Sequence, residues 1–184
     1  MKHSYEAHYN NLTLRPLEYQ DIEQLRIWRN DRALCKYLRD IPEITPEMQK
    51  AWYISYINDK HSVFFVIVDD ETNTMVGSMA IYNICEATAE IGKIFVGDRA
   101  ARGKHVGYHA IVMAMIIGIE KIGIKRFMLE CHADNIPALK SYCRAGFSEI
   151  GRHPFIKGGI ELEMAIDAEA ACKKNLFVPD IKVM

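Results

Sequence analysis

The chain has 184 residues, of which 49% are hydrophobic and 26% are charged, and its formal net charge is −1 at pH 7. Such a chain is expected to fold as a single domain over residues 1–184, and its composition excludes an intrinsically disordered protein. Because the net charge is close to zero, no global field attracts nucleic acid or an anionic membrane, so any anion site must be local. We therefore expect neither nucleic acid nor a membrane as a partner.

The cysteines indicate a reducing compartment. They are odd in number and scattered, without a CxxC pair, at Cys35, Cys85, Cys131, Cys143 and Cys172. This spacing fits neither a disulfide framework nor a zinc site. No N-terminal apolar run resembles a signal peptide, and the longest apolar stretch is too short to span a bilayer. The sequence therefore predicts a soluble, cytoplasmic protein.

The chain is expected to open with a short strand and a helix. Residues 11–15 alternate between apolar and polar side chains, as in a strand. A helix is expected over residues 18–30, where Ile22, Leu25 and Trp28 recur at three-residue steps and so share one face.

A second helix is expected to begin at Thr45, which is a good N-cap residue, with Pro46 in the first helical position. After this helix the hydrophobic period changes to that of β-structure. Three β-rich runs separated by turn residues follow, at residues 62–68, 75–84 and 89–96.

The second half of the chain alternates between helices and strands. A long helix over residues 105–122 is apolar nearly all round, which predicts burial between two layers. It is followed by a strand at 126–133, a helix at 135–145 closed by Gly146, and strands at 147–155 and 160–167. This order predicts an α+β (mixed α/β) fold, with a mixed, mostly antiparallel sheet of about 6–7 strands flanked by about 4 helices.

A short basic loop leads into the long helix, with the sequence Arg102-Gly103-Lys104-His105-Val106-Gly107. A helix N-terminus exposes backbone N–H groups and a partial positive charge, which together bind anions. The two glycines let the backbone curl toward a ligand, and the two basic side chains add full charges. The alternative is an ordinary turn with solvated basic residues. The loop matches neither a Walker P-loop nor a dinucleotide fingerprint.

A second motif follows the loop after one helix and one strand. The segment NIPALKSYCRAGF contributes Asn135, Ala138, Tyr142, Gly146 and Phe147. The two motifs, in this order and on this succession of elements, resemble the GNAT (Gcn5-related) family of acetyl-CoA-dependent N-acetyltransferases. The resemblance covers residues 11–167 and leaves residues 168–184 as a C-terminal tail.

By this resemblance, two central strands splay apart and hold acetyl-CoA as the cosubstrate. Its pyrophosphate would lie on the N–H groups from Gly103 to Tyr108, and its pantetheine would pair with the strand edge near Phe95 and Val96. The thioester carbonyl would meet the N–H of Ile94, and one such donor is worth about 2.7–4 kcal/mol of the barrier. The implied cofactor-binding residues are Ile94, Phe95, Val96, Arg102, Gly103, Lys104, His105, Val106, Gly107, Tyr108 and Asn135.

One position departs from the family pattern R/Q-x-x-G-x-G/A. His105 stands where the family has an inner glycine, so a side chain lies where the phosphate should approach. The backbone N–H remains, and Gly103 is expected to supply the missing pliability.

The resemblance implies direct attack of an amine on the thioester, so no cysteine nucleophile is needed. Tyr142 matches the family tyrosine beside the departing thiolate. A phenol with a pKa near 10 protonates a thiolate of pKa about 8.5 only uphill. Tyr142 must therefore either have a lowered pKa or act chiefly as a hydrogen-bond donor; alternatively it is a core aromatic residue. Glu90, on a central strand, is the candidate general base, unless it points to the other face and is merely solvated.

Asn135 would bind coenzyme A by family match, and it is also a good N-cap for the helix that follows. His105 and His109 lie four residues apart on a helix, which raises the alternative of a zinc site. They have no HExxH glutamate and no evident third ligand, so we expect no metal.

The first two helices normally shape the acceptor pocket in this family. Here they resemble the branch of ribosomal-protein N-terminal acetyltransferases and, more closely, the enzymes that acetylate nucleotide-linked amino sugars. Trp28, Arg29, Asn30 and Trp52 are therefore the expected substrate-binding residues. The two tryptophans could stack on a base or sugar. Alternatively, they only pack the helices on the sheet.

Three functions stay open. The first is acetylation of a small-molecule amine, with a nucleotide-linked amino sugar favoured and a polyamine held by Glu18, Glu43 and Glu47 as a lesser alternative. The second is N-terminal acetylation of a protein, and the third is a non-catalytic acyl-CoA-binding module. Homodimerisation is common in the family, and Leu176–Val178 of the tail could pack on the body or on a second copy.

Overall fold

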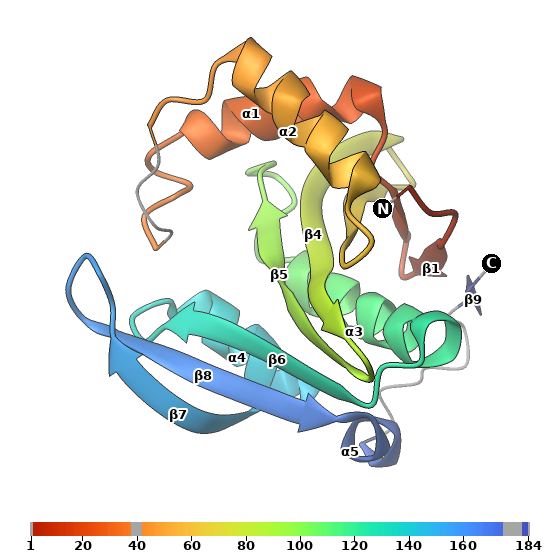
Figure 1. Cartoon of the computed structure of the whole chain (residues 1–184), viewed down its shortest axis with the longest axis vertical. Helices are drawn as coiled ribbons and strands as arrows, with labels where there is room; N and C mark the ends of the chain where they lie inside the picture. Colours follow the sequence, from red (N-terminus) through yellow and green to blue (C-terminus); the bar gives the residue numbers. More distant parts are fainter. Residues whose placement is uncertain (1, 38–41, 175–181, 184) are drawn as a thin grey trace.

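The computed structural model describes residues 2–37, 42–174 and 182–183. Its strands are β1 (Ala7–Tyr9), β2 (Leu12–Pro16), β3 (Val63–Asp69), β4 (Thr74–Cys85), β5 (Thr88–Val96), β6 (Arg126–His132), β7 (Ser148–Pro154), β8 (Ile160–Asp167) and β9 (Lys182–Val183). They form one sheet in the order β7-β8-β6-β5-β4-β3-β2-β1-β9 (Figure 1). Every neighbouring pair is antiparallel except β5 and β6, which are parallel.

The helices are α1 (Ile22–Asn30), α2 (Pro46–Asn58), α3 (Val106–Ile117), α4 (Ile136–Ala145) and α5 (Ala168–Lys173). A 3-10 turn, η1 (Tyr19–Asp21), precedes α1, and a π-helical turn, η2 (Gly118–Ile122), continues α3. Because α3 connects the parallel strands β5 and β6, it forms the expected crossover. The α+β fold with a mostly antiparallel sheet is thereby confirmed.

Two strands and one helix exceed the expected number. β1 joins β2 through Asn10 and Asn11, which both adopt a positive φ, of 49° and 58°. Asparagine tolerates this conformation in tight hairpin turns, so this pair was the available signal for β1. β9 and α5 lie in the C-terminal tail and carried no comparable signal. Leu176–Val178 lies outside the described residues.

The two faces of the sheet are covered by different helices. α3 is buried along most of its length in a cluster with Phe65, Ile81, Ile91 and Phe127, which explains its almost uniformly apolar sequence. α1 and α2 cover the other face of β3–β5, and they lie together at the top of Figure 1. The three residues expected to share one face of α1, Ile22, Leu25 and Trp28, are all buried.

The predicted helix caps are present. The N–H of Met48 donates to Oγ1 of Thr45 at 3.2 Å, and the N–H of Ala138 donates to Oδ1 of Asn135 at 3.4 Å. Gly146 ends α4 with φ of 101°, the left-handed conformation that favours glycine. Local chemistry thus fixes the start of α2 and both ends of α4.

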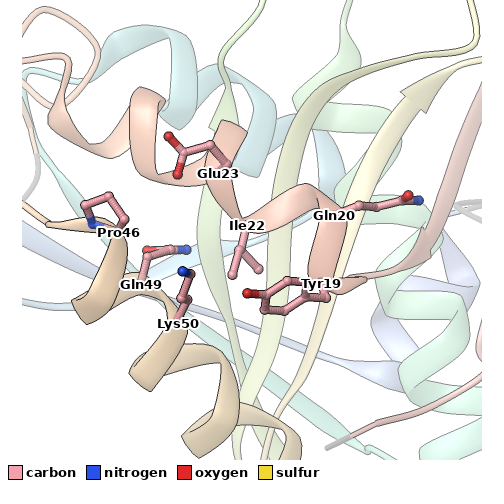
Figure 2. A pocket seen from close by; sticks show the side chains of 7 residues that line it. All are labelled: Tyr19, Gln20, Ile22, Glu23, Pro46, Gln49 and Lys50. Carbon is pink, nitrogen blue, oxygen red and sulfur yellow. The ribbon is translucent and has the colours of Figure 1, made fainter.

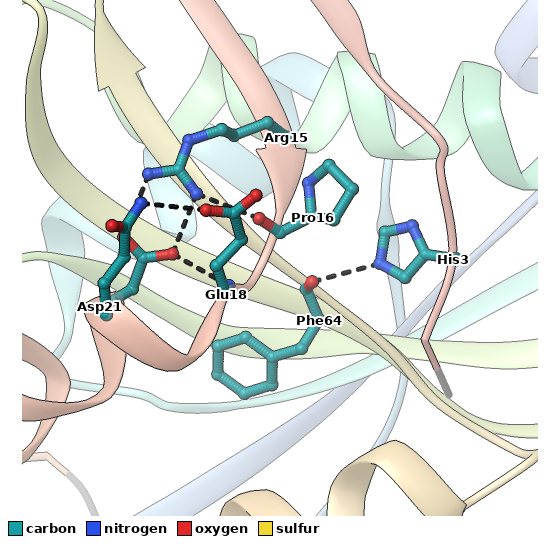
Figure 3. Close-up of polar contacts among 7 residues, drawn as sticks. His3, Arg15, Pro16, Glu18, Asp21 and Phe64 are labelled. Atoms are coloured by element: carbon teal, nitrogen blue, oxygen red, sulfur yellow. Dashed lines mark hydrogen bonds and ion pairs between the residues drawn. The ribbon is translucent and has the colours of Figure 1, made fainter.

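A buried ion pair holds the entry to α1 (Figure 3). Arg15 donates to both carboxylate oxygens of Asp21 at 2.8 and 2.9 Å, and the N–H of Glu18 donates to the same carboxylate at 2.8 Å. Asp21 is only 7% exposed, so this geometry compensates its desolvation. Strand β2 and helix α1 are thereby tied together.

No helix in the described part of the chain is long and apolar enough to cross a membrane.

Candidate active site

Strands β5 and β6 pair only at their first residues and then diverge in the middle of the sheet. Their ladder joins residues 88–90 to residues 126–128 and then stops, although β5 continues to Val96 and β6 to His132. Figure 1 shows the two strands diverging from this point. Since β6 uses its other edge for β8, residues 91–96 of β5 turn an edge toward the gap. We call this gap the split.

A β-bulge lies on β5 at the split. Ser78 pairs with Phe95 and Ala80 pairs with Gly92, so two steps on β4 face three steps on β5. The extra residue is accommodated at Lys93, which adopts φ of 53°. Bulges re-aim backbone groups and are frequent next to active sites. Here the bulge immediately precedes Ile94, the residue whose N–H was expected to meet the thioester.

The residues after the bulge face opposite sides of the sheet. Phe95 is buried beneath α1, whereas Ile94 and Val96 are half-buried against the α3 side. The Nε of Arg102 donates to the carbonyl of Val96 at 3.2 Å, which ties the basic loop to the end of β5. The loop and the split are therefore one continuous region.

The basic loop turns sharply into α3. Gly103 has φ of 79° and His105, the N-cap residue, has φ of 60°. Both residues lie in the left-handed region, which glycine adopts without strain. This conformation explains why the family pattern has a glycine at position 105. His105 adopts the conformation nonetheless, so the substitution preserves the path of the backbone.

The N–H groups at the start of α3 are available to a ligand. The N–H of His109 bonds to the carbonyl of His105 at 3.0 Å. Among the described residues, no backbone acceptor receives the N–H groups of residues 103–108. The side chains of Arg102, Lys104 and His105 are exposed around them. This arrangement suits an oxyanion such as a pyrophosphate.

The glycines of the loop leave space above the backbone. A Cβ at Gly103 or at Gly107 would meet no atom within 4 Å. Gly107 has no positive φ either, so neither packing nor backbone conformation requires a glycine there. The space and the N–H groups at the start of α3 fit a diphosphate.

Tyr142 lies on α4, facing the α3 side of the split, and is 8% exposed. Burial raises the pKa of its phenol, with Cys131 and Tyr82 adding to the effect. Burial thus acts against a lowered pKa and favours the role of hydrogen-bond donor. The phenol stays protonated at neutral pH and is suited to donate a hydrogen bond.

Glu90 pairs with Tyr82 on β4 and with Met128 on β6, so it sits where the split opens. Its side chain lies on the α1–α2 face, since its neighbours Ala89 and Ile91 belong to the α3 cluster. Nδ2 of Asn83 donates to its carboxylate at 2.8 Å. The carboxylate is thus half-buried and faces the side that α1 and α2 enclose.

Asn135 serves as the N-cap of α4, the structural role expected for it. His105 and His109 lie with ring centroids 6.3 Å apart, and Nδ1 of His109 is buried without a hydrogen-bond partner among the described residues. Burial, with Arg144 and His105 nearby, lowers the pKa of His109. No third metal ligand joins these two histidines within the described ranges.

Trp28 packs α1 on the sheet, which is the alternative to stacking on a base or sugar. It is 8% exposed, its ring stacks on Phe95 at 6.3 Å, and a Cβ at Gly97 would lie 2.1 Å from its indole. The indole therefore lies flat against the backbone after β5. This packing leaves no open face for a base or sugar, which corrects the expected stacking role.

The other three residues expected to bind the acceptor substrate have different surroundings. Asn30 exchanges two hydrogen bonds with the backbone of Ile44, at 2.9 and 3.0 Å, and so fastens the loop before α2. Trp52 is half-buried against Tyr56 and Phe64. Arg29 is half-buried, and its positive charge adds to burial, the main cause, in lowering the pKa of Lys93.

A shallow hollow of about 220 Å³ lies between α1 and α2, away from the split (Figure 2). It is lined by Tyr19, Gln20, Ile22, Glu23, Pro46, Gln49 and Lys50. None of the expected substrate-binding residues is among them. Nor do they include a residue of β5 or β6, the strands that border the split.

Sequence reasoning missed two residues at the split, Tyr82 and Lys93. The Nζ of Lys93 lies 4.8 Å from the centroid of the Tyr82 ring and 5.8 Å from that of Phe64. Burial lowers the pKa of Lys93, although Asp59 and Glu90 act in the opposite sense. A bulge leaves no clear trace in sequence, so nothing marked these residues as neighbours of the site.

Curated relatives and solved structures resemble the chain over most of its length. A Bacillus subtilis (strain 168) protein, YwnH, provisionally named a phosphinothricin acetyltransferase, is 30% identical over an alignment of 154 residues. The match covers 79% of this chain and 89% of that protein. An N-acetyltransferase 9-like protein of Nematostella vectensis is 25% identical and covers 80% of both chains.

Among solved structures, a spermidine N-acetyltransferase from Vibrio cholerae, in complex with CoA and spermine, has a TM-score of 0.80 at 23% identity. The match covers 88% of this chain and 98% of that one. A ribosomal-protein-S5-alanine acetyltransferase from Vibrio fischeri has a TM-score of 0.75 at 17% identity, over 89% and 97% of the two chains. At these identities the likeness establishes the fold.

The family is shown by a family model described as an acetyltransferase (GNAT) domain, which matches residues 11–148. This match includes the split, the basic loop and Tyr142. The chain belongs to the GNAT family and is an N-acetyltransferase that uses acetyl-CoA as its cosubstrate.

Proposed function

We propose that the protein acetylates a primary amine of a small molecule at the split between β5 and β6. The observation that carries this proposal is the end of the β5–β6 ladder at Glu90 and Met128, next to the bulge and the basic loop. One region then offers backbone donors for a diphosphate, an open strand edge for an extended chain and a carboxylate on the acceptor side.

Each residue has a task that its surroundings permit. The N–H groups at the start of α3 hold the diphosphate, and the N–H of Ile94 polarises the thioester carbonyl. Glu90, directly or through water, takes a proton from the acceptor's ammonium group. Tyr142 donates a hydrogen bond to the sulfur as the thiolate leaves, since its raised pKa opposes full proton transfer.

The face that carries Glu90 is rich in carboxylates. Glu90 pairs with Met128, so Glu130, two residues further along β6, lies on the same face. Glu163 is the cross-strand partner of Glu130, and Glu161 lies two residues before it. His153 lies among the last three, at 3.4 to 3.9 Å from their carboxylate oxygens. An acceptor entering here meets a negative surface.

This charge favours a cationic acceptor, that is, a diamine or polyamine. The resemblance to a spermidine N-acetyltransferase points in the same direction, although different carboxylates from Glu18, Glu43 and Glu47 are involved. A nucleotide-linked amino sugar remains the second candidate. It is favoured by Arg29 and Lys93, which could neutralise a diphosphate, but Trp28 and Asn30 are engaged in packing.

The test follows thiol release from acetyl-CoA with spermidine, a UDP-linked 4-amino sugar and peptides with free N-termini. We expect saturable release with spermidine, a loss of about 10²-fold in kcat for Tyr142→Phe, and a comparable loss for Glu90→Gln. The paired change Glu130→Gln and Glu163→Gln should raise KM for spermidine and leave KM for acetyl-CoA unchanged.

Tyr53→Phe, which alters a phenol of α2 whose ring contacts Tyr19 and Tyr56, serves as the matched control. Release with the amino sugar alone would replace the polyamine by the second candidate. Release with peptides alone would make the protein an N-terminal acetyltransferase. Binding of acetyl-CoA without release for any amine would identify a non-catalytic module.

A further inference from the structure

Tyr82 lies directly across the backbone of β5 at the split. A Cβ at Gly92 would come within 2.9 Å of both Cε1 and Oη of Tyr82 and within 3.3 Å of its Cζ. Side-chain carbons do not approach this closely, so glycine is needed at position 92 to leave room for the phenol. Gly92 directly precedes Lys93, the bulge residue.

The ring of Tyr82 is held from a second direction. The ammonium group of Lys93 lies 4.8 Å from the ring centroid, within the range of a cation–π contact. The ring also packs against the cluster formed by α1, α2 and the sheet. A side chain restrained by the backbone, a cation and apolar neighbours presents its hydroxyl in one place, which is what orienting a reactant requires.

Tyr82 and Tyr142 approach the split from opposite faces. Tyr82 lies on the α1–α2 face with Glu90, its cross-strand partner, whereas Tyr142 belongs to the α3–α4 side. The two phenols are close enough for Tyr82 to contribute to the raised pKa of Tyr142. One hydroxyl therefore borders the side where the acceptor enters, and the other borders the opposite side.

We propose that the hydroxyl of Tyr82 orients the acceptor amine for its attack on the thioester. The inference rests on the proposed function. The phenol oxygen accepts one N–H of the amine, which turns the nitrogen lone pair toward the carbonyl carbon. Glu90, directly or through its water, has already taken the ammonium proton and released it to solvent. The C–N bond then forms and the C–S bond breaks, with its electron pair leaving on the CoA sulfur. The second proton of the nitrogen passes through water to that thiolate, and Tyr82 keeps its own proton.

The test measures steady-state kinetics with the best amine of the wild-type protein. Tyr82→Phe removes only the hydroxyl, so we expect kcat/KM for the amine to fall about 10–100-fold. KM for acetyl-CoA and the melting temperature should stay unchanged. Gly92→Ala should displace the ring and produce a similar loss. In the double variant the loss should not exceed that of the worse single variant, because both changes remove the same hydroxyl.

Tyr56→Phe provides the matched control, since that phenol accepts the N–H of Phe64 at 3.1 Å within the core. It should lower stability without changing amine kinetics. Unchanged amine kinetics in Tyr82→Phe would overturn the inference and leave the proposed function standing. So would a change confined to KM for acetyl-CoA. A wild-type protein that binds acetyl-CoA but acetylates no amine would overturn both. If Gly92→Ala fails to fold, Tyr82→Phe alone decides.

Discussion

Three neighbouring residues of the basic loop have different physical requirements. Gly103 and His105 both occupy the left-handed region, with φ of 79° and 60°, so the backbone path itself favours glycine at these positions. Gly107 has neither a positive φ nor an atom that a Cβ would meet. Neither the backbone conformation nor the packing therefore requires a glycine at position 107. A ligand that approaches the backbone closely would require one.

Gly107→Ala should separate stability from ligand binding. Alanine is the better helix former, so we expect the free energy of unfolding to rise by about 0.5–1 kcal/mol. The added methyl group should weaken acetyl-CoA binding at least tenfold, because it occupies the space above the N–H groups. Urea unfolding and calorimetric titration measure the two effects.

Gly103→Ala is the matched control. Its methyl group also meets no atom, but its positive φ should cost about 1–2 kcal/mol of stability. A Gly107→Ala variant that binds acetyl-CoA as tightly as the wild-type protein would contradict the placement of the diphosphate on this turn.

At the scale of elements, the N-terminal segment before β1 is attached to β3 through a histidine. Nε2 of His3 contacts the carbonyl of Phe64 at 3.1 Å (Figure 3), and the ring lies 4.8 Å from Phe65. Burial lowers the pKa of His3 from 6.5 to about 4, against the opposing effect of the Phe64 carbonyl. The neutral imidazole therefore belongs to the folded state.

Acidification should accordingly weaken the fold. Between pH 6.5 and 4 the unfolded chain binds a proton at His3 that the folded chain does not, so stability falls as the pH falls through this window. The shift corresponds to about 3 kcal/mol at most, less the screening by solvent at a ring that is not fully buried. Above pH 6.5 the contribution is fully present and constant.

Urea unfolding at pH 7 and pH 4.5 measures this contribution. In His3→Gln the loss of stability between the two pH values should be smaller than in the wild-type protein. His61→Gln, which removes an exposed imidazole, controls for the loss of one histidine. An equal loss in His3→Gln and in the wild-type protein would contradict the assignment.

At the scale of the whole molecule, the split is a place where the sheet is incomplete. Residues 91–96 of β5 and the continuing part of β6 face each other without a ladder. A ligand that bonds to the edge of β5 and to the start of α3 joins elements from both parts of the sheet. Its binding free energy then adds to the stability of the whole fold.

Acetyl-CoA should therefore raise the melting temperature. At a concentration of about 100 times Kd the stabilisation is about 2.7 kcal/mol, which corresponds to about 5–10 °C for a chain of this size. Differential scanning calorimetry with and without acetyl-CoA measures the shift, and Gly107→Ala should show a smaller one at the same concentration. A wild-type melting temperature that does not respond to saturating acetyl-CoA would contradict binding at the split.

The sequence by itself determined the fold class, the seven longer strands, the four longer helices and the family. These features rest on local signals: hydrophobic periodicity, Thr45 and Asn135 as caps, Gly146 at a helix end, and two motifs at a fixed separation along the chain. Such signals act over a few residues, so they can be read without knowing which strands are neighbours. The short strand β1 and the tail elements gave too few residues for a period.

Only the tertiary structure decided where the ladder between β5 and β6 ends, where β5 bulges and which side chains meet there. Tyr82 was brought to the split because strand pairing set its position across the sheet. Trp28 was buried because α1 packs on Phe95 and on the backbone of Gly97. Likewise, Glu130, Glu161 and Glu163 share a face with Glu90 through the register of three strands. Register depends on contacts between residues far apart in the chain, and a single sequence carries no direct record of them.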